Sequence, residues 1–159
     1  MAKTRKRKIG AGDVASNRYA GYRYELLDRI ECGIVLQGTE VKALRESGAQ
    51  LKDAYASIRG GELWLQGVHI PPYAPASREN HDPERDRKLL VHRSEIDRLA
   101  ARVAERGLTL VPTRIYFSGP NAKVEIALAR GKDLYDKRQT IKERESKRDM
   151  DRALREARR

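Results

Sequence analysis

The basic residues of this chain are concentrated at its two ends, which limits the part of the sequence that can build a core. The formal net charge is +11 over 159 residues. Residues 1–8 carry +5 and residues 130–159 carry another +5, so the stretch 9–129 carries only +1. A balanced stretch of this length is large enough to fold as one domain. We therefore predict a basic N-terminal arm at 1–8, a domain at 9–129 and a basic C-terminal tail at 130–159.

This charge distribution also indicates the kind of partner. Basic arms on a near-neutral domain favour a polyanion, because each neutralised phosphate releases a counterion. Nucleic acid is the first candidate, and an acidic membrane surface or a merely solubilising tail are the alternatives. Cys32 is the only cysteine, and the chain has no signal-like segment and no run of about 18 apolar residues. We expect a cytoplasmic protein without a membrane segment.

The middle of the chain predicts a mainly β, antiparallel domain. Two hairpins are expected, one turning at Gly60-Gly61 and one at residues 118–121. Strand-like composition and alternation mark the ranges 22–36, 54–59, 62–69, 108–117 and 122–129.

A few helices complete the predicted domain. One is expected over 39–48 with Thr39 as its cap, and one over 94–107 with Ser94 and Asp97 spaced as a capping box. A short helix is expected within 11–20, and the Pro-rich range 71–86 is expected to be a loop. A helix placed before the last hairpin suits an antiparallel β-barrel of the oligonucleotide-binding type.

The tail is expected to behave differently from the domain. Beyond Ile141 it consists of helix-forming residues and mixed charges with few apolar positions, and pairs such as Glu143 and Lys147 can form ion pairs on a helix. So polar a segment has no face to bury. We predict that it is disordered when free and becomes helical on a partner.

An enzymatic function finds little support in the sequence. The histidines His69, His81 and His92 have no metal-ligand spacing, and no Gly-rich phosphate loop is present. His81 and Asp82, with His92, could serve acid–base chemistry in an RNA-processing enzyme, although a turn-stabilising His-Asp pair is the favoured interpretation. We predict no catalytic residues, no metal and no cofactor.

Two segments combine groups that suit RNA. Planar rings and guanidinium groups alternate from Asn17 to Tyr24, and both can stack on exposed bases, although packing of the tyrosines at the barrel edge is an equal alternative. Lys88 and His92 flank the triplet Leu89-Leu90-Val91, for which a core position is favoured. In the tail, Lys132, Tyr135, Lys137 and Arg138 follow the last predicted strand directly, which would aim them in one direction.

Six segments, in this order, resemble one bacterial family, that of the SsrA-binding proteins (small protein B). They are ECGIVL at 31–36, GTEVKALR at 38–45, HIPPYA at 69–74, NHDPERDRKLLVHRSEID at 80–97, GLTLVP at 107–112 and GKDLYDKRQTIKER at 131–144. The resemblance covers nearly the whole chain and implies an oligonucleotide-binding-type barrel that holds the tRNA-like domain of transfer-messenger RNA (tmRNA). It further implies delivery to stalled ribosomes, where the tail occupies the decoding site and the empty messenger channel and unfinished peptides are tagged. We expect a monomeric adaptor, with an RNA-processing enzyme and a structural ribosomal protein as the competing hypotheses.

The resemblance also assigns residues. The RNA-facing set is Asn17, Tyr24, Glu31, Leu90 and His92, to which we add the neighbouring Lys88. Glu31 would accept hydrogen bonds from base donors rather than contact phosphate, and its alternative role is an ion pair with a neighbouring arginine. The set that would face the ribosomal decoding site is Gly131, Lys132, Tyr135, Asp136, Lys137, Arg138, Ile141, Lys142 and Arg144.

Within this second set, Tyr135 would stack on a base and Lys137 and Arg138 would meet phosphate. Asp133 departs from the family, which often has a second lysine at this place.

Overall fold

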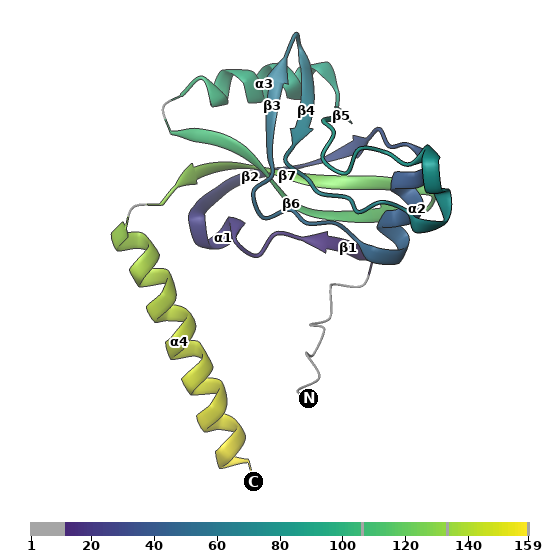
Figure 1. Cartoon of the computed structure of the whole chain (residues 1–159). Helices are drawn as coiled ribbons and strands as arrows, with labels where there is room; N and C mark the ends of the chain where they lie inside the picture. The colour runs from purple at the N-terminus through teal and green to yellow at the C-terminus, as the bar shows by residue number, and fades with distance from the viewer. Residues whose placement is uncertain (1–11, 106, 133, 159) are drawn as a thin grey trace.

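The computed structural model of the chain describes residues 12–105, 107–132 and 134–158 (Figure 1). Within them, strands dominate the first 131 residues and a long helix follows. The elements are β1 (Asp13–Ser16), α1 (Ala20–Arg23), β2 (Tyr24–Ile34), α2 (Gly38–Ser47), β3 (Tyr55–Arg59), β4 (Glu62–Gln66), the 3-10 helix η1 (Ala74–Glu79), β5 (Arg87–Leu90), α3 (Arg93–Val103), β6 (Leu108–Ser118), β7 (Asn121–Gly131) and α4 (Leu134–Ala157).

The strands form one antiparallel sheet that closes on itself. Their order is β1-β6-β3-β4-β5-β2-β7, and β7 also pairs with β6, so that six strands make a ring and β1 is attached to β6. The three 11-residue strands β2, β6 and β7 provide the longest ladders (Figure 1). The predicted antiparallel, mainly β fold with a helix before the last hairpin is confirmed, as is the turn at Gly60-Gly61, where both residues have positive φ.

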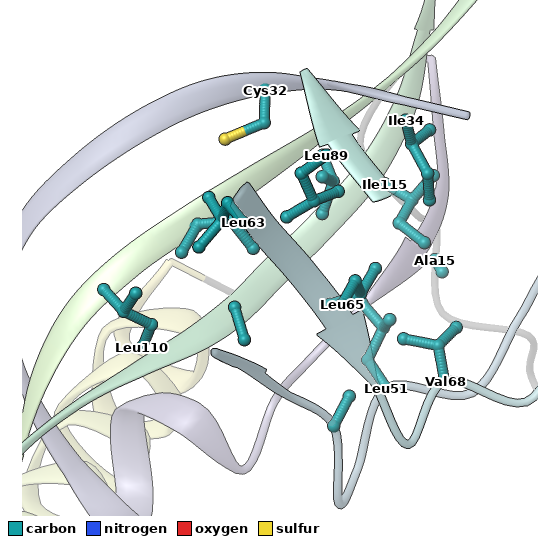
Figure 2. Close-up of a cluster of buried hydrophobic side chains, with 14 of the residues drawn as sticks. Ala15, Cys32, Ile34, Leu51, Leu63, Leu65, Val68, Leu89, Leu110 and Ile115 are labelled. Carbon is teal, nitrogen blue, oxygen red and sulfur yellow. The ribbon is translucent and has the colours of Figure 1, made fainter. Parts of the chain in front are cut away.

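The core fills the inside of this ring, as the alternation along the strands predicts. On β7, Val124, Ile126 and Leu128 are buried, and they meet inward-facing side chains of β4 and β6. Figure 2 shows part of this cluster, including Cys32, Leu63, Leu65, Leu89, Leu110 and Ile115. Burying each large aliphatic side chain contributes about 1.5–3 kcal/mol. The thiol of Cys32 is fully buried, and burial raises its pKa to about 12.

Sequence reasoning assigned the wrong structure to one segment and the wrong N-terminal caps to two helices. Residues 13–16, within the predicted helix 11–20, form β1, because Ala15 enters the core and the segment pairs with β6. The helix α2 begins at Gly38 with Gln37 as its N-cap, so Thr39 is not the cap. The helix α3 begins at Arg93 with His92 as its N-cap, and the capping box of Ser94 and Asp97 is wrong.

The Pro-rich loop is held in place by an ion triad with a buried centre, which we call the Glu40 triad: the buried Glu40 and Arg87, and the partly covered Arg85. Glu40 lies on α2 and is fully buried, and its two carboxylate oxygens accept hydrogen bonds from Arg85 Nε and Arg87 Nε, each at 2.5 Å. Arg87, also fully buried, donates from Nη1 to Val68 O (2.8 Å) and from Nη2 to Pro83 O (3.1 Å). The triad therefore ties α2, the loop and β5 together.

The tail forms a helix in the single chain. α4 extends away from the ring (Figure 1), and its side chains from Ile141 to Arg158 are exposed. The predicted lack of a buried face is confirmed, and the tail has the helical conformation that its 24 residues rich in helix formers favour. No helix among the described residues is long and apolar enough to span a membrane.

Candidate nucleic-acid interface

The outer face of four neighbouring strands, β2, β7, β6 and β1, carries a continuous polar surface. Register places Glu31 of β2 opposite Glu125 of β7, and Glu125 opposite Arg114 of β6. One step along, Lys123 of β7 lies opposite Tyr116 of β6. Two like charges directly opposite each other are unfavourable on a sheet, so Glu31 and Glu125 need partners.

Glu31 has one partner on the neighbouring strand β7 and one on β6, beyond it. It faces outward between the buried Ile30 and Cys32, and its side chain is 56% exposed. The hydroxyl of Tyr116 donates a hydrogen bond to Glu31 Oε2, and Lys123 Nζ lies 4.0 Å from Oε1. The partners are thus a tyrosine and a lysine, so the alternative role of Glu31 in a surface ion pair is present, with Lys123 in place of an arginine.

Glu125 is the centre of the neighbouring interactions, which we call the Glu125 network: Glu125, Arg114, Arg29, Thr113 and Asp13. Arg114 Nε donates to Glu125 Oε2 at 3.0 Å, while Arg29 Nη1 and Thr113 Oγ1 donate to Oε1 at 3.2 and 2.9 Å. Arg114 Nη1 also pairs with Asp13 at 3.1 Å. Burial alone would raise the pKa of Glu125, but the hydrogen bonds from Arg114 and Thr113 and the two guanidinium charges outweigh it and lower that pKa.

A hollow of about 430 Å³ opens beside Glu31, and we call it the Glu31 hollow. It brings together three residues predicted to face RNA: Glu31 of β2, and Leu90 and His92 from a segment about 60 residues later. Its lining residues are Glu31, Gly33, Leu90, Val91, His92, Glu95 and Lys123.

Leu90 gives the Glu31 hollow an exposed apolar wall. Its side chain is 55% exposed, whereas its neighbour Leu89 is buried. The expected core position of the triplet 89–91 is therefore correct for Leu89 and wrong for Leu90, because successive side chains of β5 point to opposite faces. Gly33 allows this close packing, since a Cβ at that position would lie 3.2 Å from Leu90 Cβ.

Asn17 and Tyr24 line a second hollow of about 230 Å³, which we call the Asn17 hollow. Asn17 Nδ2 donates to Pro112 O at 3.0 Å, but its Oδ1 is buried and has no partner among the described residues. A buried acceptor without a donor is costly, so this atom is suited to a donor supplied by a ligand.

Tyr19 forms the rim of the Asn17 hollow. It is 48% exposed, and the cationic groups of Arg23 and Lys52 lie 5.7 and 5.1 Å from its ring centroid. The alternation of rings and guanidinium groups pointed to Tyr19 and Arg23. No pattern pointed to Lys52, which comes from the loop between α2 and β3 and meets Tyr19 only in the folded chain.

Two other candidates have structural partners. Lys88 lines neither hollow, and its Nζ donates to Glu62 on β4 at 2.9 Å. The ring nitrogens of His81 are bonded to Thr39 Oγ1 (2.9 Å) and Ile70 O (3.0 Å) inside the domain, and Asp82 accepts a turn hydrogen bond from Glu84 N (3.0 Å). This agrees with a turn-stabilising pair. The described residues contain no group of histidine, cysteine, aspartate and glutamate that could hold a metal ion.

The tail begins with an anchored lysine. Lys132 Nζ donates to Gly21 O on α1 (2.9 Å) and to Thr140 Oγ1 on α4 (3.0 Å), and its backbone N donates to Arg23 O (3.0 Å). Lys132 therefore joins the edge of the Asn17 hollow to α4.

The structure describes the side chains of only some of the other tail candidates. The exposed ones are Gly131, Arg138, Ile141, Lys142 and Arg144. Tyr135, Asp136 and Lys137 lie in the first turn of α4, and their side chains fall outside the described part of the structure, as do Asp133 and the arm 1–8.

Comparison with known proteins gives a consistent result. The family model described as SmpB protein matches residues 14–156. The SsrA-binding protein of Syntrophobacter fumaroxidans is 56% identical over 146 residues, covering 92% of this chain and 90% of the relative. That of Thermobifida fusca is 53% identical, covering 99% of this chain and 100% of the relative.

A chain in the solved structure described as "tmRNA-SmpB: a journey to the center of the bacterial ribosome" has a similar fold. Its TM-score is 0.65 at 46% sequence identity, and the match covers 76% of this chain and 85% of that chain.

Proposed function

Because this chain belongs to the SmpB family of SsrA-binding proteins, we propose that it binds tmRNA and acts with it on the ribosome in trans-translation. In this role the protein is an adaptor of the cytoplasm. It recognises RNA by docking and catalyses no reaction. Its ring of strands holds the tRNA-like domain of the RNA, and its tail enters the decoding site and the empty messenger channel.

The observation that carries the RNA-binding part is the Glu31 hollow. It combines an exposed carboxylate from β2 with an apolar wall from Leu90 and the imidazole of His92, which both come from the end of β5 and the residues after it. Unpaired RNA bases are recognised by stacking and by hydrogen bonds to their edges, and this set of groups suits both. Phosphate is disfavoured there, because Glu31 and Glu95 both carry negative charge.

The Asn17 hollow supports the same surface. The unpartnered Oδ1 of Asn17 can accept a hydrogen bond from a base or ribose, and Tyr19 with Arg23 and Lys52 can supply stacking and phosphate contacts. We propose that RNA covers both hollows. Lys88, held by Glu62, would contact RNA only at the margin.

The tail supports the ribosomal part. The helix α4 has no buried face and carries basic side chains such as Arg138, Lys142 and Arg144, as a segment must if it lies along RNA. Lys132 is proposed to set the direction of α4 from the domain, and Tyr135, Asp136, Lys137 and Ile141 are proposed to enter the decoding site with it.

The function is tested by isolating the protein from its own bacterium and sequencing the RNA that accompanies it. A single enriched RNA with a tRNA-like fold and an internal reading frame is the expected result. A broad mixture of ribosomal and messenger fragments would contradict the proposal, and equal recovery with all ribosomes would favour a structural ribosomal protein. Cleavage of the bound RNA by pure protein and divalent metal would indicate an enzyme.

The division between domain and tail is tested by truncation after Lys132, because β7 extends to Gly131 and Lys132 bonds to α1. RNA affinity is expected to change by less than about threefold, while tagging of unfinished peptides is lost. A control variant that exchanges only the distal basic residues Arg155 and Arg158 for glutamine tests whether charge alone is responsible. Loss of RNA binding and tagging together would contradict separate roles.

A further inference from the structure

We propose that Tyr116 is the positioning residue of the RNA-facing carboxylate: it holds Glu31 as a hydrogen-bond acceptor for the donor groups of an unpaired base. The inference rests on the proposed function, because it assumes that Glu31 meets RNA. No family motif and no sequence pattern pointed to Tyr116, which lies on β6, two strands away from Glu31.

The contact reaches across an entire strand. Tyr116 lies opposite Lys123 on β7, and Glu31 lies on the far side of β7, opposite Glu125. Only a long side chain can bridge this separation, since neighbouring strands lie about 4.8 Å apart. The phenol hydroxyl of Tyr116 donates a hydrogen bond to Glu31 Oε2. The other carboxylate oxygen, Oε1, lies 4.0 Å from Lys123 Nζ, and both Glu31 and Lys123 line the Glu31 hollow.

The ring of Tyr116 is itself held in place. The guanidinium of Arg114 lies 4.4 Å from the ring centroid, and Arg114 is fixed in turn by Glu125 (3.0 Å) and Asp13 (3.1 Å). The Glu125 network thus reaches Glu31 through the ring of Tyr116, which contacts Arg114 on its face and Glu31 through its hydroxyl. Burial and the bond to Glu31 raise the pKa of Tyr116 to about 12, so the hydroxyl keeps its proton and remains a donor.

Fixing Glu31 has a consequence for recognition. An exposed glutamate loses rotamer freedom when it binds, and a side chain held beforehand avoids much of that cost. With one oxygen occupied by Tyr116, the remaining lone pairs accept from a base that presents N–H groups, such as the paired donors on the Watson–Crick edge of guanine. A base edge without donors, or a phosphate, gains nothing from this arrangement.

The test compares Tyr116→Phe, Glu31→Ala and the double variant in the full chain. Binding is measured at one salt concentration to the tRNA-like part of tmRNA from the same bacterium and to an unrelated tRNA. Tyr116→Phe keeps the ring over which Arg114 lies and removes only the donor. It is expected to weaken the tmRNA part about three- to tenfold and the unrelated tRNA by less than about twofold. Tyr73→Phe, on the loop between β4 and β5, is the matched control that removes a hydroxyl from another half-buried ring.

The double variant separates positioning from a general structural effect. If Tyr116 acts through Glu31, the double variant binds no more weakly than Glu31→Ala alone. The slope of affinity against salt is unchanged in Tyr116→Phe, because no phosphate contact is removed. Additive losses, or equal weakening of both RNAs by Tyr116→Phe, would overturn the inference while leaving Glu31 as an RNA contact. If Glu31→Ala instead weakened both RNAs by the same factor, or neither, the proposed role of Glu31 would be overturned and this inference with it.

Discussion

The molecule contains two clusters of glutamate and arginine that use the same chemistry in opposite settings. In the Glu40 triad, Glu40 and Arg87 are fully buried and every contact is made within the domain. In the Glu125 network, the arginines Arg114 and Arg29 are 42% and 58% exposed, and the carboxylates of Glu125 and Asp13 are mostly covered. The Glu40 triad fixes the Pro-rich loop to the ring of strands, whereas the Glu125 network orders polar side chains on the outer surface of the sheet.

The difference in burial between these two clusters shows that the most recognisable sequence motifs stabilise the fold. The segments GTEVK and DPERDRKLL, which mark the family, supply Glu40, Arg85 and Arg87 to the buried triad. An ion pair removed from water must be complete, because an unpaired buried charge is far more costly than an exposed one. The residues that best identify this chain therefore serve the fold first, and RNA recognition falls to side chains such as Glu31 and Leu90 that the fold leaves exposed.

The largest effect is expected from breaking the buried triad. Glu40→Gln keeps the shape of the side chain but leaves Arg87 as a buried charge without a counterion, so the free energy of unfolding should fall by about 3–5 kcal/mol. Urea unfolding followed by the fluorescence of Trp64, the only tryptophan, measures this change.

Glu46→Gln is the matched control, because Glu46 lies on the same helix α2 and is exposed. It should leave the free energy of unfolding within about 0.5 kcal/mol of the parent. If Glu40→Gln lowered the free energy of unfolding by less than about 1 kcal/mol, the burial of Glu40 and Arg87 would not explain how much the triad contributes to stability.

The architecture followed from the sequence because period-two alternation and turn chemistry specify hairpins locally. Gly60-Gly61 and the alternating Val124, Ile126 and Leu128 suffice to place two hairpins. The strand β1 could not be predicted, because only pairing with β6 makes residues 13–16 extended. The strand β5 was missed for a similar reason: its residues follow a polar loop, and the burial of Arg87 depends on Glu40, 47 positions earlier in the sequence.

The site was predictable only in part, for the same physical reason. Resemblance named Glu31, Leu90 and His92, and the structure brings these three into one hollow. No local sequence pattern could identify Tyr116 or Lys52 as part of the site, because each residue contacts a side chain that is distant in the sequence: Tyr116 contacts Glu31, and Lys52 contacts Tyr19. Charge pattern also could not reveal that the ammonium group of Lys88 donates a hydrogen bond to Glu62 across the pair of strands β4 and β5.

An intermediate effect is expected from the surface network, and it should depend on pH. The pKa of Glu125 is lowered in the folded chain, so its carboxylate stabilises the fold above the ordinary carboxyl pKa of 4.5, and this contribution is lost as the pH falls through the folded value. Glu125→Gln should therefore cost about 1 kcal/mol in the free energy of unfolding at pH 7 and progressively less below pH 4.5.

Urea unfolding of both proteins at pH 7 and at acidic pH measures the difference. Glu25→Gln, at an exposed position of the same sheet on β2, serves as the control and should show little difference at either pH. A cost that stays constant as the pH falls would show that Glu125 acts through packing rather than through its charge.

The smallest effect is expected where both partners lie in water. Arg93 Nε and Asp97 Oδ1 are 3.5 Å apart on α3, and their side chains are 75% and 68% exposed. Asp97→Asn should change the free energy of unfolding by no more than about 0.5 kcal/mol, and 1 M salt should abolish any difference, because the screening length is then about 3 Å. If Asp97→Asn lowered the free energy of unfolding as much as Glu125→Gln does, and 1 M salt did not remove the loss, the ranking of these ion pairs by burial would be contradicted. Exposure would then not distinguish an ion pair that contributes little to stability from one that contributes measurably.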